Sequence, residues 1–383
     1  MSKKRGSLAN DKRESGIELL KIIAIFLIVI SHVCQSVGQK PTQLPELYPK
    51  LINSNLATEN LQYLVIAFCR HFGALGNNIF LACSFWFLCG SSKVRWNKIV
   101  TMLGDIWVIS MLYLFIYTCM GENLSRSLII KCVFPTLYAN NWFLTCYILV
   151  YMLHPYLNII INNIPQKTHA VMCIISLALY GGIVFFKSGL LYSSNLVWFI
   201  VMYFLISYMK TYMQNWFNQR KRCIGVLLCG IAGMLGMLLV TNFMGLHWKA
   251  FRSELLNWNV NNNPFIIMTA VALFHLFRQI KFKSSCVNYI AGCSLIIYVI
   301  HENILFRSFT RVRIWVNLLD KYGHDTIVVQ MLGYSIVLFL LATLAALLYQ
   351  YFIHGIVKWI GTYIESFFKK IIDALASTVM KIK

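Results

Sequence analysis

Long apolar stretches that recur along the whole chain are the feature that most limits how this sequence can fold. Stretches of about 18 or more apolar residues can each cross a hydrocarbon core of about 30 Å as a helix. Of the 383 residues, 58% are hydrophobic and only 12% are charged, which excludes an ordinary water-soluble domain. Membrane-spanning strands would show shorter, alternating segments, so the pattern predicts an all-α integral membrane protein. One expected partner is therefore the lipid bilayer itself.

The apolar segments predict a bundle of about ten transmembrane helices, and an even number places both termini on one side. About 21 of the 34 Lys and Arg residues fall on the side of the N-terminus, which the positive-inside rule assigns to the cytoplasm. The net charge of +21 therefore encodes orientation, and we expect no nucleic-acid partner. The expected spans are Ile17–Val37, Phe72–Gly90, Ile99–Met120, Asn141–Leu157, Ala170–Phe186, Leu196–Met213, Cys223–Met244, Phe265–Ile280, Cys286–Leu305 and Ile327–Ile353.

The chain divides into three parts: a basic cytoplasmic tail (1–16), a transmembrane domain (17–355) and an amphipathic cytoplasmic tail (356–383). The first apolar run is too long for a cleaved signal and lacks a small-residue cleavage site, so we expect it to remain as an anchor. In the last part, apolar residues interleave with lysines, as in a helix that lies in the membrane interface; a frayed extension of the last span is the alternative. The twelve cysteines show no metal-type spacing, and we expect no metal.

Ionisable residues inside the first span are candidates for a functional site, because a charge at the bilayer centre costs at least a few kcal/mol. Lys21 and His32 are 11 residues apart, which places them on one helix face about 16 Å apart along the axis. Glu18 lies one turn before Lys21 and can pair with it. The alternative is that Lys21 extends to the inner interface and His32 hydrogen-bonds a neighbouring helix.

The ninth span carries a second group of ionisable residues at a matching depth. His301 and Glu302 lie 15 and 16 residues beyond Cys286, and His32 lies 15 residues beyond Ile17. Both spans run from inside to outside, so the three side chains should meet in the outer half of the membrane. A neutral imidazole can accept a proton from a hydroxyl, and a neighbouring carboxylate can fix its tautomer. The pattern therefore predicts a base with an orienting partner.

Three other ionisable residues inside spans are expected to be structural. Asp105 can pair with Lys98, seven residues earlier. His154 lies at a helix end before Pro155, and His275 stands alone in its span. The sequence favours a structural role over a catalytic one for each of the three.

The first span resembles the signature of the membrane-bound acyltransferase-3 family, in which an acidic residue is followed by an arginine, ten apolar residues and a histidine. Here the positions are Glu18, Lys21 and His32. Lysine in place of arginine keeps the positive charge but loses the bidentate geometry.

Further matches follow in the family's order. FLACSFWFLCG (80–90) is similar to its second helix and retains Ser84, and KVRWNK (93–98) is similar to its basic loop motif, with Arg95 and Lys98. NNWFLTCYILVYMLHPYLN (140–158), which contains Trp142, and YVIHENI (298–304) resemble two later segments.

The resemblance implies transfer of an acyl group, commonly acetyl from cytoplasmic acetyl-CoA as co-substrate, to a hydroxyl of a surface polysaccharide or lipid-linked glycan. It places the protein in the plasma membrane as a multi-pass enzyme. A direct transfer and a transient acyl-histidine are both compatible with it, as are acetyl and succinyl donors. The implied roles are donor binding by Lys21, Arg95 and Lys98 with Glu18, catalysis by His32 with Glu302 or His301, and oxyanion or acceptor contacts by Ser84 and Trp142.

Two other classes of protein remain open. A transporter or flippase of a glycolipid or small metabolite also carries intramembrane charges, but it would transfer no acyl group and would ideally show a symmetric pair of broken helices. A membrane sensor or assembly subunit could keep the fold without the chemistry.

Overall fold

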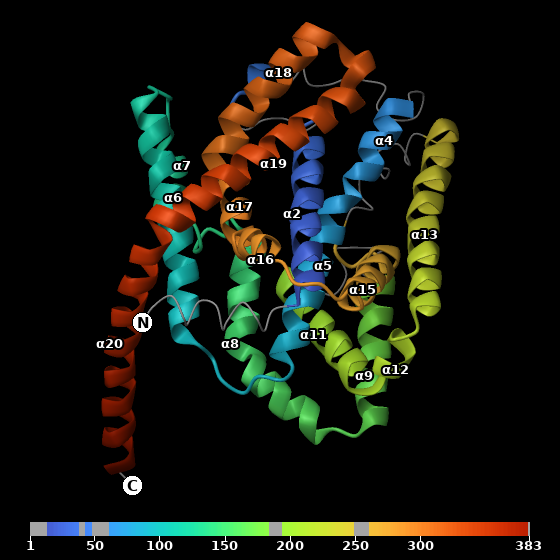
Figure 1. Ribbon diagram of the computed structural model, residues 1–383. Helices are drawn as coiled ribbons and strands as arrows, with labels where there is room; N and C mark the ends of the chain where they lie inside the picture. Colours follow the sequence, from blue (N-terminus) through green and yellow to red (C-terminus); the bar gives the residue numbers. More distant parts are fainter. Residues whose placement is uncertain (1–13, 38–42, 48–60, 184–193, 249–259, 382–383) are drawn as a thin grey trace.

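The computed structural model describes residues 14–37, 43–47, 61–183, 194–248 and 260–381, and all regular structure in these ranges is helical (Figure 1). The predicted all-α class is therefore confirmed. The helices are α2 (Ser15–Gln35), α4 (Leu61–Cys69), α5 (His71–Leu88), α6 (Trp96–Cys119), α7 (Arg126–Val133), α8 (Trp142–Asn163), α9 (Gln166–Leu177), α11 (Asn195–Tyr212), α12 (Gln214–Phe217), α13 (Arg220–His247), α15 (Pro264–Arg278), α16 (Ser285–Gly292), α17 (Ser294–His301), α18 (Arg311–Tyr322), α19 (Ile327–Phe352) and α20 (His354–Lys381).

Six helical segments in the described ranges are long and apolar enough to cross a membrane, so the chain is a membrane protein but the expected count of about ten is not confirmed. The eighth expected span forms α15, which has only 15 residues. The fifth forms α9 and a short π-helix (Ala178–Ile183), and its last residues lie outside the described part. The six segments are Ser15–Gln35, Leu61–Leu88, Trp96–Cys119, Trp142–Asn163, Arg220–His247 and His324–Phe352.

Helix α2 lies inside the bundle, in contact with α5, α15, α16, α17 and α19. Its closest approach to α5 depends on two glycines. A Cβ atom on Gly76 would lie 2.6 Å from the Ala24 carbonyl oxygen, and one on Gly73 would lie 2.6 Å from the Ser31 hydroxyl. Small residues let two helix backbones approach in this way. The pairing of Gly73 with Ser31 and Gly76 with Ala24 makes the two helices antiparallel.

The ninth expected span is broken into α16 and α17. The break falls at Cys293, and the Ser294 hydroxyl donates to the Ala291 carbonyl oxygen across it (2.8 Å). Helix α17 ends at His301, and the Asn303 side chain accepts from the backbone N–H of Leu305 as the next helical turn begins (2.9 Å). Glu302 therefore lies in a short non-helical link between the end of α17 and the helical turn that begins at Ile304.

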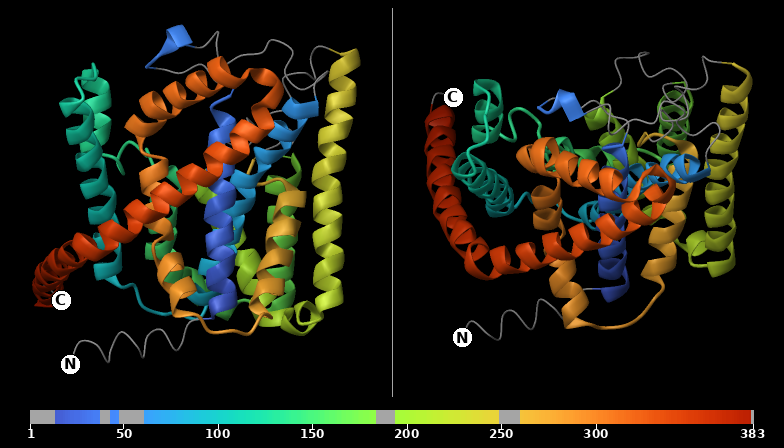
Figure 2. Two further views of the ribbon diagram at one scale, coloured as in Figure 1. Left: turned by 45° about the horizontal axis from the view of Figure 1, so that its top comes forward. Right: turned by 90° about the horizontal axis from the view of Figure 1, so that it is seen from above.

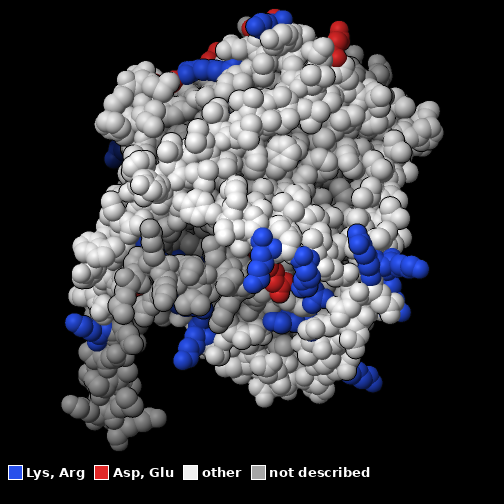
Figure 3. Space-filling model, in the orientation of Figure 1, with Lys and Arg blue, Asp and Glu red and all other residues white. Residues whose placement is uncertain are grey.

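The basic end of the bundle is the end where α2, α6 and α16 begin. Figure 2 shows the starts of α2 and α16 at one level, and the Ser15 hydroxyl donates to Asn288 Oδ1 of α16 (3.0 Å). On the face seen in Figure 3, most Lys and Arg side chains gather toward this end. The placement of both termini in the cytoplasm stays a prediction.

Helix α20 follows α19 and packs along α6 (Figure 2). The Asn97 side chain donates to the Thr362 hydroxyl (2.8 Å), and Gly104 leaves room for Val357. The expected amphipathic tail is thus helical from His354 to Lys381. Its position in the membrane interface stays a prediction.

Candidate active site

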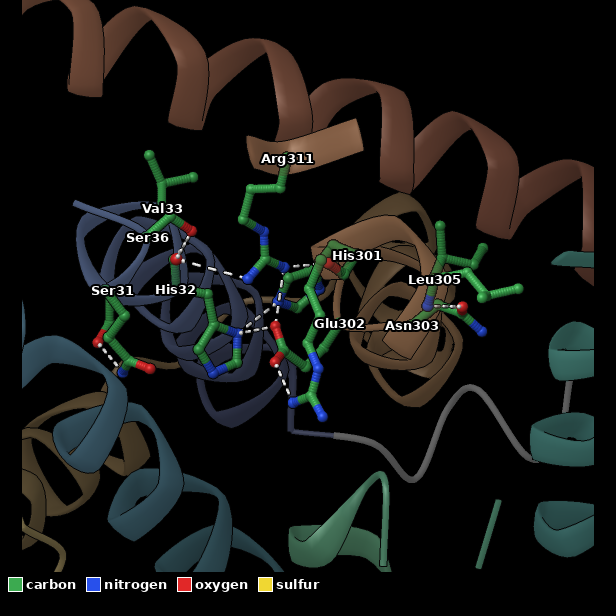
Figure 4. A network of polar contacts seen from close by, with 12 residues as sticks. Ser31, His32, Val33, Ser36, His301, Glu302, Asn303, Leu305 and Arg311 are labelled. Carbon is green, nitrogen blue, oxygen red and sulfur yellow. Dashed lines mark hydrogen bonds and ion pairs between the residues drawn. The ribbon is translucent and has the colours of Figure 1, made fainter. Parts of the chain in front are cut away.

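A cluster of five ionisable side chains, here called the polar cluster, joins α2, α17 and α18 (Figure 4). Nδ1 of His32 lies 3.0 Å from Oε2 of Glu302 and 3.0 Å from Nε2 of His301. Arg311 donates to Oε2 of Glu302 (2.8 Å), and Arg307 donates to Oε1 (3.1 Å). The depth match in the sequence therefore brings His32, His301 and Glu302 together as predicted.

The hydrogen bonds fix which nitrogen of each ring carries the proton. Nδ1 of His301 lies 2.8 Å from the Ile297 carbonyl oxygen, which can only accept, so this nitrogen is the donor. In the neutral ring, Nε2 of His301 is then an acceptor, like the Glu302 carboxylate. Both face Nδ1 of His32, which must therefore carry the proton of that ring. The lone pair of His32 is left on Nε2, which has no hydrogen-bond partner in the described part of the chain.

Arg311 holds the polar cluster together. Its side chain is only 4% exposed, and it donates to the carbonyl oxygen of His301 as well as to Glu302. A weaker contact of 3.5 Å reaches the carbonyl oxygen of His32. One guanidinium thus fixes the end of α17 and the position of the carboxylate at once.

His32, His301 and Glu302 could also be considered as a metal site, because their ligand atoms lie within 4.8 Å of one another. Both oxygens of Glu302 already accept from guanidinium groups, and Arg307 and Arg311 add positive charge. These contacts fit a hydrogen-bonded network better than a bound cation. The absence of a metal stays a prediction.

A cavity of about 640 Å³ leads from the basic end toward the polar cluster. It is lined along α2 from Ile17 to Ile28, a rise of about 16 Å. Its deep end is formed by Asn77, Phe80, Phe143 and Tyr298 among others. The ring of Tyr298 lies 6.3 Å, centroid to centroid, from that of His32, which is one turn beyond Ile28.

The four predicted donor-binding residues, Glu18, Lys21, Arg95 and Lys98, all line this cavity. The expected pair forms, with Nζ of Lys21 3.0 Å from Oε1 of Glu18. Lys98 donates to the Tyr147 hydroxyl at 3.3 Å. Three cations therefore converge at one mouth, where Glu18 pairs with Lys21 and Glu14 is a second carboxylate in the lining.

Ser84 and Trp142 lie away from the polar cluster. Ser84 lines the cavity, but it is eight residues, or about 12 Å, beyond Gly76 on α5, and so lies near the level of Lys21. Trp142 packs edge-on against Phe143 (5.8 Å between ring centroids), behind the cavity wall. An oxyanion role for Ser84 beside His32 is thus not supported by its position.

The predicted pairing of Asp105 with Lys98 is wrong. Asp105 instead accepts from the Tyr349 hydroxyl (3.0 Å) and lies 3.0 Å from Nδ1 of His354, both from the C-terminal helices. Local spacing on α6 could not reveal partners so distant in sequence. His275 is fully buried and stacked on Phe217 at 4.0 Å between centroids, as expected of a structural residue.

Arg307, Arg311 and Tyr298 are candidate functional residues that we did not single out from the sequence. Both arginines lie in a segment expected to be an outer loop, where charges are common. Tyr298 entered only as part of a short motif. Its position three residues before His301, on the same helical face, was the available signal.

Apolar helices around an enclosed polar site define an integral membrane protein with a buried histidine–carboxylate pair. A family model described as an acyltransferase domain matches residues 14–351, so the chain belongs to the acyltransferase-3 family. It is therefore a membrane acyltransferase. The comparison with curated proteins gave no significant match, and neither did the comparison with solved structures.

Proposed function

We propose that this protein is a plasma-membrane O-acyltransferase, which moves an acetyl group from cytoplasmic acetyl-CoA to a hydroxyl of a surface polysaccharide or lipid-linked glycan. The observation that carries this proposal is the cavity between Lys21, Arg95 and Lys98 at one end and Tyr298, beside His32, at the other. The family membership supports the acyl transfer. The excess of Lys and Arg at the basic end supports a cytoplasmic position for the donor.

The shape and charge of the cavity suit a CoA thioester. Its phosphates would bind the cations at the mouth through charge-assisted hydrogen bonds, while the nucleotide stays at the cytoplasmic end. The pantetheine arm spans roughly 15–20 Å when extended, by the usual reach of an amide-linked chain. The stretch of α2 that lines the cavity, from Ile17 to Ile28, rises about 16 Å. The thioester would therefore lie close to the polar cluster.

His32 would act as the general base through Nε2, the nitrogen with the free lone pair. The acceptor hydroxyl gives its proton to Nε2, and its oxygen bonds to the thioester carbonyl carbon. Glu302 accepts a hydrogen bond from the Nδ1–H group and stabilises the imidazolium that forms. The C–S bond then breaks, and the proton passes from His32 to the departing thiolate. The products are an O-acyl ester and free CoA thiol.

Tyr298 is the best-placed donor for the negative charge that develops on the carbonyl oxygen. Its ring lines the deep end of the cavity, and its hydroxyl makes no hydrogen bond with any residue that the structure describes. Ser84 lies nearer the mouth, about 12 Å from the level of Gly76. A hydroxyl that donates a hydrogen bond to a developing oxyanion stabilises the transition state and so lowers the activation barrier of acyl transfer.

Two measurements test the proposed function. Proton NMR of the surface polysaccharide from a strain that lacks the gene should show loss of O-acetyl methyl signals relative to its parent. Purified protein in proteoliposomes, given labelled acetyl-CoA and the parent glycan, should transfer the label to the glycan. An unchanged polysaccharide together with no transfer by the purified protein would reject the proposal.

A further inference from the structure

A second cavity of about 720 Å³ lies beside the first, at the basic end. It is bounded by the first turns of α6 and α16 and by the junction of α19 with α20. Its lining shares Arg95, Lys98, Met102, Gly292 and Leu295 with the first cavity. The two spaces are therefore neighbours across a wall that carries two cations.

The second cavity has an excess of positive charge. Lys358 of α20 lines it together with Arg95 and Lys98, and none of the three forms an ion pair with a residue in the described ranges. Its one carboxylate, Asp105, is already bonded to Tyr349 and His354. The lining can thus accept an anionic ligand without displacing a carboxylate from its lysines or arginine.

The order of groups in a CoA thioester fixes what must lie beyond the diphosphate. The acyl group and pantetheine arm come first, then the diphosphate, and then the ribose with its 3′-phosphate and adenine. If the arm fills the first cavity, the diphosphate reaches the wall of Arg95 and Lys98. The nucleoside then continues on the far side of that wall, where the second cavity lies.

We infer that the second cavity holds the 3′-phosphorylated adenosine of the CoA donor, with Lys358 facing the 3′-phosphate. This inference rests on the proposed function. The half-exposed Tyr289 offers a ring face on which a purine can stack, and Gln350 offers an amide for its edge. The contact of Asp105 with His354 fixes the start of α20 against α6, so this helix becomes a wall of the donor site.

Binding of three donors to the full-length protein in nanodiscs separates this site from the first cavity. The donors are acetyl-CoA, acetyl-3′-dephospho-CoA and acetyl-4′-phosphopantetheine, each measured by competition with labelled acetyl-CoA. We expect Lys358→Gln to weaken acetyl-CoA binding about tenfold, as for the loss of one charge-assisted contact. The other two donors should bind as before. Lys358→Arg should bind acetyl-CoA normally, and so should Lys93→Gln, a matched exposed lysine outside both cavities.

Each other outcome overturns the inference. Equal weakening of all three donors by Lys358→Gln, or no weakening of any, would remove Lys358 from the 3′-phosphate site. Native mass spectrometry that shows phosphatidylglycerol bound to the wild type and lost from Lys358→Gln, with unchanged donor binding, would assign the cavity to a lipid headgroup. Wild-type protein that binds acetyl-CoA and acetyl-4′-phosphopantetheine equally well would refute the inference but keep the proposed function. Binding of none of the donors would refute both.

Discussion

Nδ1 of His32 and Oε2 of Glu302 lie 3.0 Å apart, although one residue belongs to the first expected span and the other to the ninth. This contact and the bond of His301 to the Ile297 carbonyl oxygen leave Nε2 of His32 as the unprotonated nitrogen. A base with a fixed tautomer is what proton removal from a hydroxyl requires.

His32→Ala should abolish acyl transfer, and Glu302→Gln should lower kcat by about 10²–10⁴-fold, the range for loss of a general base or of its orienting carboxylate. Neither change touches the predicted phosphate-binding residues, so acetyl-CoA binding should be unchanged. The measurements are initial rates with purified protein and equilibrium binding of labelled acetyl-CoA. Normal glycan acetylation by His32→Ala at equal protein abundance would contradict the catalytic role.

Tyr298→Phe should lower kcat about 10²-fold, as for removal of one oxyanion donor, with little change in donor binding. The ring remains, so its packing against His301 and Phe143 is retained. Tyr147→Phe, which removes a hydroxyl from the mouth of the same cavity, is the matched control and should keep a near-normal kcat. Equal rates for both variants would remove the Tyr298 hydroxyl from the mechanism.

Lys21→Met should weaken acetyl-CoA binding about tenfold, because one charge-assisted contact is lost. Lys21→Arg should keep or improve binding, since a guanidinium can bind phosphate with two parallel hydrogen bonds. Titration with labelled acetyl-CoA measures the affinity of both variants. Unchanged binding by Lys21→Met would mean that Lys21 serves only as the partner of Glu18.

Arg311→Met should destabilise the protein by about 3 kcal/mol or more, because it leaves a buried carboxylate short of a partner. Arg311 and Glu302 are 4% and 9% exposed, whereas Arg307 is 39% exposed. Arg307→Met should therefore lower the apparent Tm much less. Thermal unfolding of the purified variants compares them, and equal losses would show that Arg311 does not hold the polar cluster together.

An ion pair outside the spans predicts a pH effect on stability. The Arg313 guanidinium hydrogen-bonds Glu122 and lowers the pKa of that carboxyl from its ordinary value of 4.5. A lowered pKa in the folded state stabilises the protein above the ordinary value, and this contribution is lost as the pH falls through the lowered one. The difference in Tm between wild type and Glu122→Gln should thus be present at pH 6 and shrink progressively below pH 4.5. Because Arg313 is 43% exposed, added salt should also reduce this difference in Tm.

The pairing of Glu18 with Lys21 and the meeting of His32 with His301 and Glu302 could be predicted because both follow from helix geometry. Residues on one helix face, or at equal depth in two spans, have positions set by a rise of about 1.5 Å per residue. The all-α membrane class and the family were predicted from the same apolar spans.

Contacts that depend on the packing of distant helices could not be predicted in this way. The position of Arg311 depends on how α18 crosses the ends of α2 and α17, and the partners of Asp105 come from α19 and α20. The break at Cys293 leaves no mark in hydropathy, because a short buried helix is as apolar as a spanning one. The number of spans was therefore harder to predict than the site.

The ion pair between Glu18 and Lys21 gives this cation a resident counter-ion inside an apolar wall. A bare ammonium there would attract chloride or any stray carboxylate. With Glu18 three residues away, a singly charged anion gains little, since it only replaces one negative partner by another. We therefore expect the Glu18–Lys21 pair to favour polyanions that also contact Arg95 and Lys98 over the far more abundant monovalent ions of the cell.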